Sequence, residues 1–250
     1  MRQALFGLLL VILGTTGSAA QVVQIESARI RTDTTGWAGN VSASVQLTRS
    51  AGNVLDIGTN LHLQYKTQRN LFLILNNLDL IRADSQNFEN RGFEHFRYNY
   101  KVRDWFTWEA FAQAQYNKPL RLDFRGLVGV GPRVKLFVTK TARAYVASLV
   151  MVERERITDS DSVRRDIRLS NYVSFTIQPN PKLRLASTTY YQPNARDPGD
   201  YRIASDSTFS AGVTEKLAVF ASLSVLYDTR PPLGVVSTSY AFKNGIVYGF

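Results

Sequence analysis

The residues best suited to acid–base chemistry are the two histidines, His62 and His95, which are the only imidazoles in the chain. A lipid hydrolase would need a serine, a histidine and an acid or amide on neighbouring strands, so that the histidine can activate the serine hydroxyl. If the stretch 41–48 pairs with the stretch 55–66, Ser42 lies diagonal to His62, but this pairing supplies no acid as a third member. The sequence therefore predicts that the protein is not an enzyme, and a lipid-modifying enzyme is kept as the less favoured alternative.

No cofactor and no metal site is predicted. Each histidine is alone in its segment, and the chain has no cysteine, which excludes thiolate ligands and disulfides. Gly126, Gly129 and Gly131 do not form a phosphate-binding loop, because no helix follows them. Glycines inside a strand instead indicate twist or the close approach of two backbones, and Pro132 predicts a β-bulge or a kink because it cannot donate to a strand ladder.

These residues lie in segments whose hydrophobicity alternates with a period of two. Residues 55–66 and 106–116, for example, each alternate apolar and polar side chains. Such alternation is typical of β-strands that have one apolar and one polar face. The segments begin near residues 38, 54, 70, 92, 104, 120, 141, 165, 182, 201, 217 and 236. Because no later segment has about eighteen consecutive apolar residues, no helical membrane span is predicted.

Strand length and connections distinguish a membrane barrel from a soluble sandwich. The segments are long enough for the roughly 9–11 residues of a tilted membrane strand, whereas sandwich strands average about 5–6 residues. Tight turns near 68–69, 103–104, 140, 180 and 215 alternate with connections at 83–86, 157–163 and 194–200 that are predicted to be longer. Aromatic residues gather near strand ends, as in interfacial girdles. We therefore predict an all-β fold, a transmembrane antiparallel β-barrel of about 12 strands.

The first residues predict export. Arg2, the apolar run 4–13 and the small residues Ser18 and Ala20 form the layout of a signal peptide over residues 1–20. Residues 21–36 are predicted to form a periplasmic segment before the barrel or a plug in its lumen, and residues 37–250 the barrel itself. The predicted location is the outer membrane of a Gram-negative bacterium.

The last segment, 240–250, carries its aromatic residues in one phase and ends in Phe250. It resembles the C-terminal signal by which the barrel-assembly machinery recognises the last strand of outer-membrane barrels. That resemblance implies a recognition role for four aromatic residues. They are Tyr240, Phe242, Tyr248 and Phe250.

The polar phase of the strands predicts what lines the lumen. Its candidate lining residues are His62, His95, Arg97, Glu109, Arg125, Arg133 and Arg168. Positive charge is in excess, in line with the formal net charge of +10, and a basic lumen would favour small anionic solutes. The alternative is a closed core in which arginines and carboxylates satisfy one another. Several inward positions between 71 and 151 are apolar, so we expect residues 21–35 to cover them.

The stretches 95–101 (HFRYNYK), 105–111 and 125–133 (RGLVGVGPR) resemble the YdiY-like group of salt-induced outer-membrane proteins, also called domain of unknown function 481. The similarity extends over roughly residues 37–250. It implies an outer-membrane barrel and a link to osmotic stress, and it implies no catalytic residues. Pro132 departs from the plainer strand of that pattern.

Together these observations predict a narrow channel with a basic lumen or an envelope protein of the salt-stress response. A closed structural barrel without flux is the main alternative. The predicted partners are outer-membrane lipid including lipopolysaccharide, the barrel-assembly machinery and small anionic solutes, with no nucleic acid.

Overall fold

The computed structural model describes residues 35–49, 53–83, 86–158, 163–214 and 217–248. These residues form twelve strands and no helix that is long and apolar enough to span a membrane. The strands are β1 (Gly36–Arg49), β2 (Asn53–Lys66), β3 (Asn70–Ala83), β4 (Gln86–Lys101), β5 (Phe106–Asn117), β6 (Leu122–Val138), β7 (Ala142–Ile157), β8 (Val163–Asn180), β9 (Leu183–Pro193), β10 (Tyr201–Gly212), β11 (Leu217–Asp228) and β12 (Thr238–Tyr248).

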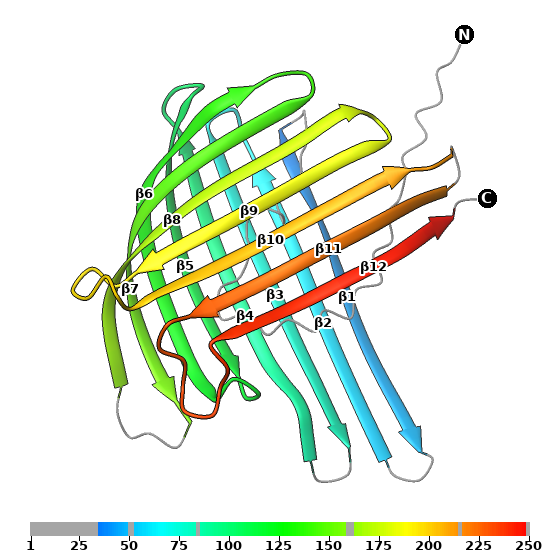
Figure 1. The fold of residues 1–250 in the computed structure, drawn as a ribbon, viewed down its shortest axis with the longest axis vertical. Helices are drawn as coiled ribbons and strands as arrows, with labels where there is room; N and C mark the ends of the chain where they lie inside the picture. Colours follow the sequence, from blue (N-terminus) through cyan, green and yellow to red (C-terminus); the bar gives the residue numbers. More distant parts are fainter. Residues whose placement is uncertain (1–34, 50–52, 84–85, 159–162, 215–216, 249–250) are drawn as a thin grey trace.

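All twelve strands of the described residues belong to one sheet, and each pairs antiparallel with its neighbours in sequence, from β1 to β12. The sheet curls strongly, so that β9–β12 lie in front of β1–β5 in Figure 1. The prediction of an all-β fold with about twelve antiparallel strands is confirmed. Every connection is a hairpin, which is why alternation in the sequence was enough to locate the strands.

The two faces of the sheet differ as the alternation predicts. On β5, Glu109, Phe111 and Gln113 are buried, whereas Trp108, which precedes Glu109 on the opposite face, is 46% exposed. The buried phase faces the inside of the curl, because side chains of strands three apart meet there, such as Tyr172 of β8 and Glu109 of β5. The outer phase is largely apolar. Its exposed members include Val128, Val130, Val150, Val152, Ile167, Val173, Ile177, Leu223, Phe242 and Ile246.

The connections fall at two ends of the sheet. At one, which we call the turn end, the chain passes from β2 to β3, β4 to β5, β6 to β7, β8 to β9 and β10 to β11, and all these connections are short, as predicted. At the other, the loop end, connections include 194–200 and 229–237. The prediction of a longer connection at 83–86 is wrong: the β3–β4 ladder continues to the pair Ala83 and Gln86. Polar residues there join the ladder because backbone hydrogen bonds do not depend on side-chain polarity.

Aromatic rings form a row on the outer face at each end. At the turn end, neighbouring ring centroids of Trp37, Tyr65, Phe72 and Tyr98 are 4.7, 6.4 and 4.9 Å apart along β1–β4. At the loop end, the corresponding distances among Tyr191, Tyr201 and Tyr227 are 5.5 and 5.9 Å. Tyr190 lies on β9 next to Tyr191, but its side chain is buried on the inner face, so it is not part of an interfacial girdle.

A bulge or kink is predicted at Pro132, and the register shows no bulge at that residue. Gly131 and Pro132 have no partner in the β7 ladder, yet the register is the same before and after them, and the shift falls between Lys135 and Phe137. A Cβ at Gly131 would lie 2.2 Å from the carbonyl oxygen of Ser148, so the two backbones approach closely there. The missing donor of proline is thus tolerated without an extra residue in the strand.

The two ends of the strand order, β1 and β12, have no ladder to each other within the described residues. Side chains on both faces of β1 are exposed from Asn40 to Arg49. Two long strand edges carry unpaired backbone groups, which pairing between them would satisfy. Val41 and Val45 lie on the outer face of β1, and Tyr240 and Phe242 lie on the outer face of β12. If β1 pairs with β12 to close the sheet, the register must keep these side chains on the same face.

Closure can be tested with disulfides, since the chain has no native cysteine. Ser44→Cys on the inner face of β1 is expected to cross-link within one molecule to one of three inner positions of β12, Ser239→Cys, Ala241→Cys or Lys243→Cys, because paired strands bring Cβ atoms within about 4.5–5.5 Å. Non-reducing gel mobility of the refolded protein reports the bond. Ala43→Cys, one residue away on the opposite face, is the matched control. Equal cross-linking from positions 43 and 44, or only intermolecular products, would contradict closure.

Candidate functional site

The inner face near the loop end holds a group of charged side chains that we call the loop-end cluster. Its centre is Arg202 of β10. The Arg202 guanidinium donates to Glu153 at 2.8 Å, to Glu155 at 3.2 Å and to Asp228 at 2.9 Å. Arg125 of β6 donates through Nε to Glu155 at 2.9 Å. Glu153 and Glu155 lie two residues apart on β7, so the pleat turns both toward the inside.

The cluster continues to β8 and the connection 194–200. Arg168 is fully buried, and its Nη2 donates to Asp200 at 2.7 Å while its Nε lies 3.7 Å from Glu153. Burial raises the pKa of the Asp200 carboxyl group, but hydrogen bonds and charge from Arg168, Asn194 and Arg164 outweigh burial and hold the pKa below its ordinary value. Asp200 is therefore ionised at neutral pH and ties the connection to the strands.

The charges of the loop-end cluster nearly cancel. Four arginines (Arg125, Arg164, Arg168 and Arg202) face five carboxylates (Glu153, Glu155, Asp166, Asp200 and Asp228). Apart from Arg164 and Asp166, these side chains are buried. A buried charge is stable only if it is paired and hydrogen-bonded. The loop-end cluster therefore closes one part of the inner face instead of presenting free positive charge to solutes.

A second polar group surrounds Glu109, the fourth residue of β5. Its carboxylate accepts hydrogen bonds from Tyr172 Oη at 2.7 Å, from Arg97 at 3.5 Å and from Asn99. The Arg133 guanidinium lies 3.7 Å from the same carboxylate and 3.9 Å from the centroid of the Tyr145 ring. This group joins β4, β5, β6 and β8 across the inside of the sheet.

The histidines occupy polar but structural positions. His95 is directly opposite Gln113, and its Nδ1 lies 3.0 Å from Gln113 Oε1, while Nε2 accepts a hydrogen bond from Arg97 at 3.3 Å. His62 is half-buried opposite Asn40 and Leu75. Among the described residues, no three His, Cys, Asp or Glu side chains are placed to hold a metal ion.

The apolar inner residues pack against one another. Phe111, Leu127, Leu149 and Met151 form one core with inner residues of β8–β11, which include Tyr172, Tyr190, Ala204 and Leu226. Leu73 and Leu75 form a smaller core with Leu71 and Phe93. Residues 21–35 were expected to cover these side chains, and all of them but residue 35 lie outside the described residues, as does the predicted signal peptide.

Toward the turn end the inner face becomes basic. Lys135, Arg143 and Arg184 form what we call the turn-end cluster: Lys135 is opposite Tyr145, Arg143 is opposite Thr176, and Arg184 is on β9. Within the described residues none of the three has a carboxylate at salt-bridge distance, in contrast to Arg133 beside Glu109. The excess of positive charge that the sequence predicts for the inside thus collects at one mouth.

Parts of the inner face of β1, β2, β11 and β12 carry small side chains, beside larger ones such as His62, Phe220 and Leu226. Together we call the small side chains the small-residue wall. Its members are Asn40, Ser42 and Ser44 of β1, Gly58 and Asn60 of β2, Ser222 and Ser224 of β11, and Ser239 and Ala241 of β12, with Lys243 as a longer neighbour. The largest buried side chains of the inner face lie on other strands, among them Arg125, Arg168, Tyr172 and Arg202, so the inside is unevenly occupied.

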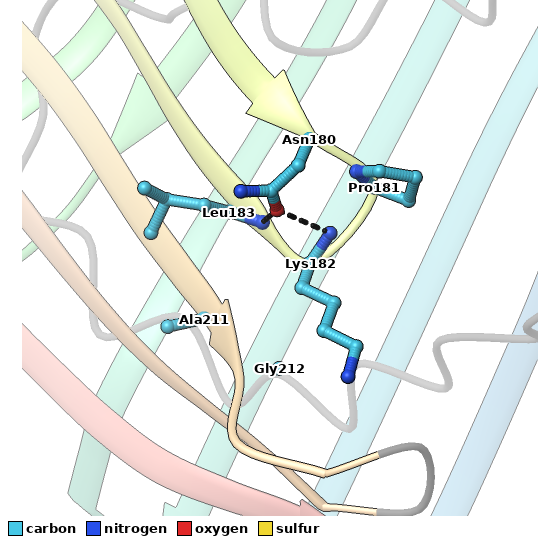
Figure 2. Close-up of a pocket in the computed structure, with 6 residues that line it drawn as sticks. All are labelled: Asn180, Pro181, Lys182, Leu183, Ala211 and Gly212. Atoms are coloured by element: carbon cyan, nitrogen blue, oxygen red, sulfur yellow. Dashed lines mark hydrogen bonds between the residues drawn. The ribbon is translucent and has the colours of Figure 1, made fainter.

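A hollow at the turn end carries no chemistry of its own. It is lined by Asn180, Pro181, Lys182, Leu183, Ala211 and Gly212. Figure 2 shows that the Asn180 side chain accepts hydrogen bonds from the backbone N–H groups of Lys182 and Leu183, both at 3.0 Å. The asparagine therefore stabilises its own turn, and its polar atoms do not point toward a ligand.

The sequence-derived lining residues are brought together only in part. Glu109, Arg97, Arg133 and His95 belong to one polar group, whereas Arg125 and Arg168 lie in the loop-end cluster, and His62 is apart from both. Tyr240, Phe242 and Tyr248 are exposed on the outer face of β12, and Phe250 lies outside the described residues.

Sequence reasoning missed the partners that compensate these arginines. Glu153 and Glu155 are the most central of them. The alternation could have found them, because Leu149 and Met151 precede them in the same inward phase. Asp200 could not be found this way, since it lies in a connection where no period applies.

Comparisons with known proteins identify a family and similar solved structures. The structure titled "NanC porin structure in rhombohedral crystal form" is similar with a TM-score of 0.46 and 13% identity, covering 86% of this chain and 98% of that one. No curated protein matches. The family model described as "Protein of unknown function, DUF481" matches residues 41–250, and the family resemblance of the sequence is confirmed. The chain therefore belongs to the DUF481 family.

Proposed function

We propose that the protein is an outer-membrane β-barrel that forms a narrow polar channel. The apolar outer face supports the membrane location. Val128 is 63% exposed and Val152 57%, and similar residues recur on strands around the sheet. A continuous belt of exposed aliphatic side chains is unfavourable in water and is expected to contact lipid.

The outer-face aromatic residues near the two ends of β5 have the spacing of a bilayer. On β5 the outer-face residues run from Phe106 at the turn end to Tyr116 near the loop end, with Trp108, Ala110 and Ala112 between them. Ten residues extend about 33 Å at roughly 3.3 Å each. With a strand tilt of about 40°, this corresponds to a height of about 25 Å, which is the height of the apolar band of outer-membrane barrels.

Export and insertion follow from the same proposal. Short turns in such barrels face the periplasm and longer loops face outward, so the turn end would be periplasmic, together with the start of β1 and the end of β12. The outer-facing Tyr240, Phe242 and Tyr248 on the last strand are suited to recognition by the barrel-assembly machinery. A role in osmotic adaptation would fit an envelope channel.

The single observation that carries the channel is the small-residue wall. In a closed barrel of twelve strands the interior is wider than one layer of side chains can fill when these are serine, glycine and alanine. The bulky side chains of β4–β10 would face this wall across a gap that water can fill. We therefore place the conducting path between the wall and the Glu109 group.

Single-channel recording of the refolded protein in a planar bilayer tests this proposal. Ser44→Trp is expected to lower the conductance about tenfold or more, because an indole on the wall would obstruct the path. Ala43→Trp is the matched control: it lies next to Ser44 on the outer face, so its conductance should stay near that of the parent protein. Equal conductance of the two variants would contradict this path.

The loop-end cluster favours a second candidate function, a closed barrel without flux. Its compensated, buried charges connect β6, β7, β8, β10 and β11 across the inside and could seal that end. This candidate predicts no channel openings from protein that migrates as a folded, heat-modifiable barrel. Discrete openings of the parent protein would exclude it.

A further inference from the structure

Two outward arginines are direct cross-strand partners near the loop end. Arg154 of β7 and Arg165 of β8 are paired in the ladder, and both side chains are exposed. The Cβ atoms of such a pair lie about 4.5–5.5 Å apart, and like charges at this distance destabilise the sheet. Within the described residues, neither guanidinium has a carboxylate at salt-bridge distance. Other arginines near the loop end have a carboxylate at this distance. Arg156 lies 3.9 Å from Asp123, and Arg230 lies 2.6 Å from Asp197.

The surroundings leave one side of the pair accessible. The neighbour of Arg154 on β6 is Gly126, which has no side chain. The Phe124 ring lies over this glycine, since a Cβ there would be 3.1 Å from Phe124 Cε1. Phe124 is itself 40% exposed. An aromatic ring thus lies over the glycine that is the β6 neighbour of Arg154.

The Arg154–Arg165 pair lies at the border of the apolar belt that is nearer to the loop end. Val152 precedes Arg154 by one outward position, and Ile167 follows Arg165 in the same way; both are exposed. One outward step along a strand is about 6.6 Å. Long arginine side chains can therefore keep their stems against the acyl region and their guanidinium groups at headgroup level.

We propose that Arg154 and Arg165 form a binding site for the phosphate of a phosphorylated lipid in the outer leaflet. Each guanidinium presents a planar pair of N–H donors that matches phosphate oxygens. A phosphate with about two negative charges compensates both arginines at once, which removes their mutual repulsion. The site rests on the proposed function, because it requires the belt below it to be in a membrane.

The test measures lipid binding to the folded full-length chain in neutral detergent. The probes are lipid A carrying its phosphates, the same lipid with the phosphates removed, and inorganic phosphate alone. We expect the parent protein to bind the phosphorylated lipid at least about tenfold more tightly than the other two probes, since charged hydrogen bonds supply this margin. Arg154→Gln with Arg165→Gln should abolish that preference, and Arg154→Lys with Arg165→Lys should restore part of it.

Arg49→Gln with Arg196→Gln is the matched control. Both arginines are exposed at the loop end. The variant also loses two positive charges, but these do not come from residues that are direct cross-strand partners. It is expected to bind like the parent protein. Equal weakening in both double variants would overturn the site, as would equal affinity for inorganic phosphate. Lipid binding and conductance are measured separately. A parent protein that binds the phosphorylated lipid but does not conduct refutes the channel alone. A channel whose lipid binding is unaltered by Arg154→Gln with Arg165→Gln refutes this site alone.

Discussion

Replacing Arg202 with alanine is expected to lower the free energy of unfolding by about 3–5 kcal/mol, the cost of removing one partner from a buried ion pair. Arg202 contacts Glu153, Glu155 and Asp228 at 2.8–3.2 Å, and all four side chains are buried. Without the guanidinium, three carboxylates would remain in a region that excludes water. Urea unfolding of the refolded protein in vesicles, followed by the fluorescence of its three tryptophans, measures the change.

Two variants separate this effect from a general loss of charge. Arg184→Ala removes another inner-face arginine, but one without a carboxylate at salt-bridge distance among the described residues, and should cost less than about 1 kcal/mol. Arg202→Met combined with Glu153→Gln removes one charge of each sign and should recover part of the lost stability. If Arg202→Ala were as stable as Arg184→Ala, the loop-end cluster would not hold the strands together.

Reversing the turn-end cluster is expected to invert ion selectivity. The substitutions Lys135→Glu, Arg143→Glu and Arg184→Glu change three positive charges to three negative ones at one mouth of the inside. A mouth lined by charges of one sign concentrates ions of the opposite sign, so anion preference should become cation preference. The reversal potential across a tenfold salt gradient should change sign, and the effect should weaken at about 1 M salt, where the Debye length is roughly 3 Å.

The control for this prediction changes the same number of charges elsewhere. Arg49→Glu, Arg82→Glu and Arg196→Glu alter exposed arginines at the loop end. They should leave the sign of the reversal potential unchanged, because they lie outside the turn-end mouth. A parent channel that already prefers cations would contradict the role given to the turn-end cluster.

Most of the fold could be predicted from alternation, because a strand turns successive side chains to opposite faces. The strand positions, their antiparallel order and the inward phase of residues such as His95 and Arg97 followed from that period. The start of β4 could not be read in this way. Its first residues, 86–91, are polar except for Phe88, so no alternation marks the start of the strand although the ladder forms there.

The sequence also predicted an excess of positive charge on the inner face of the sheet. The alternation along each strand decides which charged residues face inward, and therefore the net charge of that face. Which charges meet was decided by the curvature of the sheet. Arg202 and Glu153 lie on strands three apart, and only the curl brings them to 2.8 Å. The same curvature gathers Arg125 and Arg168 among carboxylates and leaves Lys135, Arg143 and Arg184 together at the other end. Periodicity is a local property of the chain, whereas pairing across the inside depends on how far a whole sheet bends.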